Sequence, residues 1–339
     1  MDKRIEYESH DFLPTEFLYQ HNFAFLYHDI MCEFLQSGEE KNIFKKQFLF
    51  DNEEEAKSFK QTQDVFEWLE HHNKTQLRAE VLRATVFPAV LSDFLHFIFE
   101  ALDCSRKEKL TVAFALLRKP IQENLYVLES IALDPEDFAK QLSGNPAGLH
   151  GPGIGGVEAH YRHISDVLIK LNLENQFDAQ YLANLRYEKS GDCLAGTCDL
   201  ALHLFTKHPK IKTEDLNINF IFSKRDEHIT QWAFLYGRLP YILAYAWEMV
   251  MHLSRYLAII DSNYMGDLKF RITANSQLWW ASIPEYLKTK ELEKFANEQK
   301  SWFDNYCNNQ EEIRKSWPMH KQLWKWLRYK IFSKKTDWW

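Results

Sequence analysis

Glycine and proline are scarce in this chain, at 11 and 10 of its 339 residues. Both residues are typical of turns, so their scarcity argues against a turn-rich β-sandwich and favours long helices. The five cysteines form no Cys-x-x-Cys pair, and their number is odd. This usage predicts reduced thiols and a cytoplasmic protein rather than a secreted, disulfide-stabilised one.

Several enzyme motifs are also missing from the sequence. It contains no GxSxG nucleophile elbow, no phosphate-binding P-loop and no HExxH zinc motif. The segment 151–156 formally matches GxGxxG, but no strand is predicted before it, so a dinucleotide site is not expected. The sequence therefore predicts neither a cofactor nor a metal ion.

Targeting and membrane signals are lacking as well. Residues 1–14 have no basic region followed by an apolar run, so no secretory signal is expected. The most apolar stretch, residues 239–260, is interrupted by Glu248, His252 and Arg255. It predicts a buried helix rather than a membrane-spanning segment, which makes a membrane the less expected partner.

What the chain does contain is apolar side chains at helical spacing. Hydrophobic residues make up 45% of it and aromatic residues 15%, which is enough for a large core. One predicted helix begins at Pro14 and stops at Gly38, and another, from Thr75, is expected to kink or break at Pro88. The prediction is an all-α, irregular multi-helix bundle.

Six of the eleven glycines fall within residues 144–156 and predict a loop between two packed halves. The expected organisation has four parts: a helical half over residues 1–143, the Gly-rich loop 144–156, a second helical half over 157–266, and a Trp-rich, basic helical segment over 267–339.

A predicted helical hairpin carries the first cluster of polar residues. Helices over 75–102 and 107–133 are joined by a short polar turn at 103–106, which predicts antiparallel neighbours. Such a pairing brings Asp93 opposite Arg118 among apolar residues, so a buried ion pair is expected. His96 shares a helix face with Asp93, and Glu129 shares one with Arg118. These residues form either a satisfied buried network or a functional site.

The segment Arg118-Lys119-Pro120-Ile121-Gln122-Glu123-Asn124 resembles the arginine-x(4–6)-histidine signature of the HEPN helical ribonucleases. The resemblance covers about one helical hairpin. It implies a metal-independent ribonuclease in which Arg118 steadies the scissile phosphate, and it implies a homodimer. Asn124 stands where the family has histidine, and Lys119 replaces a small polar residue. His96 is therefore expected to carry the proton of the RNA 2′-hydroxyl, with Asp93 and Glu129 orienting the site. Segments 118–131 and 213–223 also resemble uncharacterised bacterial proteins of unknown function.

The C-terminal segment is the second candidate for binding. Residues 313–335 contain eight Lys or Arg, no acidic residue and several tryptophans. Basic and aromatic residues together suit stacking on single-stranded nucleic acid, an anionic membrane surface, or a protein partner. An ordinary docking helix has the same pattern. The candidate nucleic-acid contacts are Arg314, Lys315, Lys321, Trp324, Lys325, Trp326 and Arg328.

His160 and His163, one helical turn apart near Glu158 and Arg162, form a third cluster. The pattern predicts a polar helix start with an i, i+4 ion pair, because a third metal ligand is not evident. Three functions follow from the sequence: a protein that engages RNA and cleaves it, a non-catalytic interaction module, and a peripheral membrane protein that uses the C-terminal tail.

Overall fold

The computed structural model describes residues 12–144, 149, 155–203 and 225–315. Over these residues it consists of α-helices with short 3₁₀ and π-helical turns and contains no strand. The predicted all-α multi-helix bundle is therefore confirmed.

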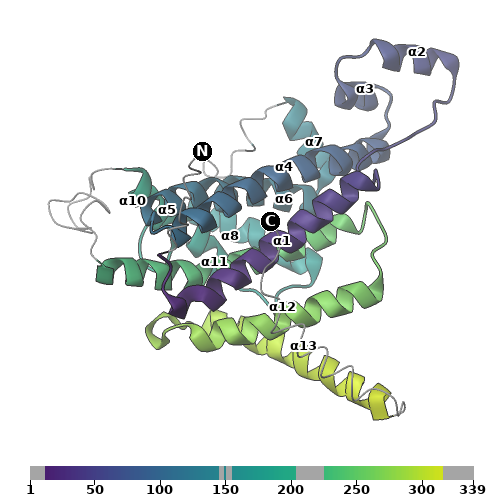
Figure 1. Cartoon of the computed structure of the whole chain (residues 1–339). Coiled ribbons are helices and arrows are strands. Elements are labelled where there is room, and N and C mark those ends of the chain that lie inside the picture. Colours follow the sequence, from purple (N-terminus) through teal and green to yellow (C-terminus); the bar gives the residue numbers. More distant parts are fainter. Residues whose placement is uncertain (1–11, 145–148, 150–154, 204–224, 316–339) are drawn as a thin grey trace, which may run out of the picture.

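Two long helices that contact one another run at an angle in Figure 1 and approach most closely at one end. Helix α1 is Leu18–Glu40 and α4 is Thr75–Arg106. The predicted stop at Gly38 is wrong, because the left-handed conformation falls on Asn42, with φ 55°. Gly38 stays helical, and a Cβ there would lie 2.5 Å from the ring of Phe44, which folds back onto it. Of the kink or break predicted at Pro88, the break does not occur, because α4 continues through this residue.

Between α1 and α4 the chain makes a small hairpin that projects from the bundle (Figure 1). It consists of α2 (Glu53–Gln61) and α3 (Val65–His71). Both helices have side-chain N-caps, from Asn52 and Asp64 respectively. The hairpin encloses its own cluster of aromatic rings around Trp68 and so covers one end of α4.

The α4–α5 hairpin is present as predicted. α5 (Leu110–Lys119) packs against α4, and a π-helical turn, Pro120–Asn124, leads into α6 (Leu125–Leu133). Proline lacks the N–H that an α-helix needs at that position, which is consistent with the local change of helix type. The hairpin turn is centred near Glu108, with φ 60°, a few residues later than the sequence predicted.

The remaining helices surround α11, the central helix of the bundle. α11 (Arg225–Ser254) is buried along nearly all of its length from Trp232 onward. It contacts α1, α4, α5 and α6, so one core joins residues from both predicted halves. The other helices are α7 (Pro135–Gly144), α8 (Gly156–Leu171), α9 (Ala179–Tyr187), α10 (Leu194–Leu202), α12 (Ser262–Ser282) and α13 (Lys290–Lys315).

Among the described residues, α4 is the one helix long and apolar enough to cross a membrane, and 44% of its most apolar window is buried in the fold. All five cysteines are free thiols, and Cys193 and Cys198 are buried in the core near α10.

Candidate functional site

The α4–α5 hairpin carries a polar cluster centred on Asp93. The Lys119 ammonium lies 2.7 Å from Asp93 Oδ2, and the Asn124 side-chain amide donates to the same oxygen at 2.8 Å. Burial alone raises the pKa of Asp93, but these two hydrogen bonds outweigh it and hold the pKa below its usual value. His96, one turn along α4, is exposed and acts on Asp93 in the same direction through its charge. Asp93 is therefore a carboxylate at neutral pH.

Arg118 points the other way, towards α10. Its Nε donates to Asp199 Oδ1 at 3.0 Å, and its Nη1 lies 3.9 Å from Glu123 Oε1. The Arg118 side chain is 35% exposed and that of Asp93 is 40% exposed. Both groups therefore lie at the surface, where a phosphate can reach them.

The predicted buried ion pair between Asp93 and Arg118 is thus wrong in its partners and in its burial. The later hairpin turn shifts the pairing of the two helices, so Asn124 lies opposite Asp93. Arg118 is left beside α10, which packs on α5 and supplies Asp199. Arg118 also need not be buried between the helices, because its long side chain can extend to water.

Glu129, the other predicted member of this set, lies elsewhere, in the core. It and Arg186 of α9 are both 0% exposed and form a two-pronged ion pair. Tyr245 of α11 donates its hydroxyl to Glu129 Oε1 at 2.7 Å. Burial raises the pKa of Tyr245 well above its usual value, so the phenol stays a donor. Glu129 is therefore fully occupied and cannot orient His96.

The π-helical turn completes this buried network. The carbonyl of Ile121 accepts from Arg186 Nε at 2.6 Å, and that of Gln122 accepts from the Tyr187 hydroxyl at 3.1 Å. Tyr187 in turn accepts from Arg186 at 2.9 Å. All three guanidinium nitrogens thus have partners, as a buried charge requires. The network joins the π-helical turn, α6, α9 and α11 at the centre of the bundle.

The two histidines of α8 pack against this network. The ring of His160 stacks on Tyr187, with centroids 3.5 Å apart. His163 stacks on Tyr126, and its Nε2 lies 3.6 Å from Glu129 Oε2. Burial lowers the pKa of His163, so the ring is neutral at neutral pH. The predicted ion pair between Glu158 and Arg162 is present, at 3.1 Å. No group of three or more potential metal ligands lies together in the described part of the chain.

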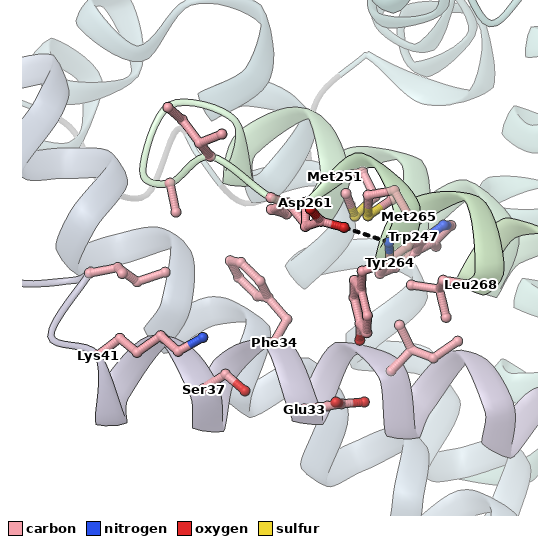
Figure 2. A pocket seen from close by; sticks show the side chains of 16 residues that line it. Glu33, Phe34, Ser37, Lys41, Trp247, Met251, Asp261, Tyr264, Met265 and Leu268 are labelled. Carbon is pink, nitrogen blue, oxygen red and sulfur yellow. Dashed lines mark hydrogen bonds between the residues drawn. The ribbon is translucent and has the colours of Figure 1, made fainter.

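A separate cavity of about 410 Å³ opens between α1, α11 and α12 (Figure 2). Its lining includes the buried side chains of Trp247, Met251 and Leu268. Figure 2 shows Tyr264 reaching from α12 towards Glu33 of α1. Burial raises the pKa of Tyr264, and the Glu33 carboxylate raises it further. Apolar side chains line this cavity together with the polar residues Glu33, Ser37, Lys41, Asp261 and Tyr264.

Comparison of the chain with protein-family models, curated proteins and solved structures finds no match. The functional assignment therefore depends on the geometry of the side chains.

The predicted C-terminal contacts fall largely outside the described residues. Arg314 and Lys315 belong to the last turn of α13, whereas Lys321, Trp324, Lys325, Trp326 and Arg328 lie beyond it. Their role in binding nucleic acid remains a prediction from the sequence.

Two residues that form ion pairs with the predicted site residues, Lys119 and Asp199, had no predicted role in the site. Lys119 was noted as a departure from the HEPN pattern, yet it is the cation that pairs with Asp93. Asp199 lies 81 residues beyond Arg118 and follows the small, buried Cys198. Nothing in the sequence links it to the hairpin. The structure thus places two partly exposed ion pairs at this hairpin, Asp93 with Lys119 and Arg118 with Asp199, and an exposed His96 one turn along α4 from Asp93. We call these five residues the hairpin surface.

Proposed function

We propose that the chain engages RNA through the hairpin surface and cleaves it without a metal ion. The observation that carries the proposal is that two neighbouring cations, each paired with a different aspartate, and a histidine beside one of those aspartates are all open to solvent at least in part. Lys119 is 43% exposed and Arg118 is 35% exposed, and His96 is exposed beside Asp93. Cations and a proton carrier at one surface are what phosphodiester cleavage needs.

Arg118 and Lys119 are suited to phosphate for different reasons. Arginine offers a planar fork of donors that matches phosphate geometry, whereas lysine is a compact point charge. Each currently pairs with an aspartate, Arg118 with Asp199 and Lys119 with Asp93. A phosphate binds by displacing these carboxylates in part. Because exposed ion pairs contribute only about 0.2–1 kcal/mol each, the exchange costs little.

The chemistry follows from the positions of His96 and Asp93. His96 takes the proton of a ribose 2′-hydroxyl as its oxygen attacks the adjacent phosphorus. The new O–P bond forms as the bond from phosphorus to the 5′-oxygen breaks. The imidazolium then returns its proton to that leaving oxygen. Asp93 stabilises the transient positive charge on His96, and Asn124 holds Asp93 in place from the buried side.

The other predicted properties fit around this proposal. Five free thiols suit a reducing, cytoplasmic setting. A homodimer is part of the HEPN resemblance, and a second copy would bring another hairpin surface to the same RNA. The basic tail would add stacking and phosphate contacts if it binds nucleic acid, and a protein partner or a membrane is the alternative for that segment.

Cleavage is tested with a fluorescently labelled single-stranded RNA. His96→Gln is expected to lower the cleavage rate by about 10²-fold or more, the usual contribution of a general acid–base group. Since His96 is exposed, its replacement should leave helical content and thermal stability unchanged. Arg162→Ala, which alters an exposed ion pair on α8, serves as the matched control and should cleave normally.

An RNA with a 2′-deoxy sugar at the cut site should resist the wild-type chain, since the attacking hydroxyl is gone. Equal cleavage by wild type and His96→Gln, or cleavage of the deoxy substrate, would reject the proposed chemistry. Absence of any cleavage with intact RNA binding would favour the non-catalytic interaction module instead.

A further inference from the structure

One turn of α1 places a cysteine and an aspartate within hydrogen-bonding reach of one histidine. His28 Nε2 lies 3.5 Å from Cys32 Sγ, and His28 Nδ1 lies 2.8 Å from Asp29 Oδ1. Residues four apart on a helix share one face, which brings Cys32 next to His28. Asp29 follows His28 directly and closes the row at the other ring nitrogen. This group uses none of the residues of the hairpin surface.

The hydrogen bond to Asp29 sets the state of the ring. Because a carboxylate only accepts, His28 Nδ1 carries a proton. Burial by itself lowers the pKa of His28, but the hydrogen bonds to Asp29 and Cys32 outweigh it and raise the pKa to about 9, so the ring is an imidazolium at neutral pH. Cys32 Sγ lies 3.5 Å from Nε2 and 3.9 Å from Nδ1, beside this positive charge, and a neighbouring imidazolium favours the thiolate form of a cysteine, which is the nucleophile.

The surroundings hold the ring in place and leave the sulfur accessible. His28 is buried, and its ring packs edge-on against Phe25 of α1 and is tilted against Phe99 of α4. Asp29 is 69% exposed, and Cys32 is partly exposed. The imidazole is therefore fixed by two aromatic rings and a carboxylate, while solvent reaches the thiol side. Reactive cysteines occur in such partly exposed, electropositive surroundings.

We propose that Cys32 is a reactive thiol, activated by His28 and Asp29, at which the chain is oxidised by hydrogen peroxide. The Cys32 thiolate, held beside the His28 imidazolium, attacks one peroxide oxygen with its sulfur. An S–O bond forms as the O–O bond breaks, and the departing hydroxide takes the proton from His28 to leave as water. Sulfur is oxidised by two electrons to sulfenic acid, and peroxide is reduced to water.

The other cysteines of the chain provide the comparison. Burial raises the pKa of the Cys104 thiol, and it raises that of Cys198 further. Cys104 is partly exposed on α4, as Cys32 is on α1. Exposure alone therefore predicts similar reactivity for Cys32 and Cys104, whereas the His28–Asp29 pair predicts a large difference.

The test treats the full chain with limiting hydrogen peroxide at neutral pH, traps sulfenic acid with dimedone and locates it by peptide mass spectrometry. Cys32 is expected to be labelled at least about tenfold faster than Cys104. The advantage should shrink as the pH rises and the Cys104 thiol ionises. His28→Gln should remove it, and Asp29→Asn, a change at an exposed side chain, should reduce it severalfold without affecting the fold.

Labelling of Cys32 no faster than that of Cys104 in the wild type would overturn the proposal. So would a Cys32 rate that is the same in the wild type and in both variants. Because Asp29→Asn leaves the packing of His28 intact, it keeps the test decisive even if His28→Gln destabilises α1.

Discussion

Replacing Arg186 with leucine is expected to lower the free energy of unfolding by about 3–5 kcal/mol. The substitution leaves the Glu129 carboxylate fully buried without its guanidinium partner. It also removes the donors to the carbonyl of Ile121 and to Tyr187. Urea unfolding followed by far-UV circular dichroism measures the change.

Two further variants distinguish the effect of an unpaired buried charge on stability from the effect of losing a side chain. The double variant Glu129→Met with Arg186→Leu should be more stable than Arg186→Leu alone, because no charge is left unpaired in the core. Arg162→Ala, in the exposed pair with Glu158, should change stability by no more than about 0.5 kcal/mol. A loss below about 1 kcal/mol for Arg186→Leu would show that the pair does not hold the core together as described.

Replacing Gly196 with alanine is expected to destabilise the chain by about 1–3 kcal/mol. A Cβ at this position would lie 2.6 Å from the carbonyl oxygen of Lys189 and 2.9 Å from Cys193 Sγ. The nearest atom belongs to the backbone, so α10 would have to move away from the preceding loop. The gain of about 1 kcal/mol in helix propensity cannot offset that shift.

Gly266 in α12 provides the matched control, since it is also a helical glycine. Its nearest neighbour for a Cβ is the Tyr306 ring at 3.5 Å, an ordinary contact. Gly266→Ala should therefore leave stability unchanged or raise it by up to about 1 kcal/mol. Thermal unfolding of the two variants in parallel gives the comparison. If both variants are equally stable, the close approach at Gly196 is not a constraint.

The helical class of the fold was predictable because apolar residues recur at helical spacing and turn residues are scarce. The α4–α5 hairpin was predictable from a short polar turn between two apolar helices. Its register was not, because the turn conformation falls on Glu108, a residue with no special preference for positive φ. A shift of a few residues was enough to exchange Arg118 for Lys119 and Asn124 as the partners of Asp93.

The buried network illustrates a different limit. Glu129 is the one acidic residue in the apolar helix α6, and such a residue needs a buried partner. The sequence thus signals that a partner exists but not which one. Arg186 lies 57 residues further along on α9, and the choice depends on how α9 packs against the π-helical turn. Local pattern carries no information on that packing.

Arg118 and Lys119 are the proposed phosphate-binding groups. Removing the cation or the anion of the Arg118–Asp199 ion pair tests this role most directly. Fluorescence anisotropy with a labelled single-stranded RNA compares the wild type, Arg118→Ala and Asp199→Asn over a range of salt concentrations. Arg118→Ala should weaken binding and reduce the salt slope by about one. Asp199→Asn frees the guanidinium from its partner 3.0 Å away and should tighten binding, by up to roughly fivefold. Equal affinity of all three chains, or weakening by both substitutions, would contradict RNA binding at the hairpin surface.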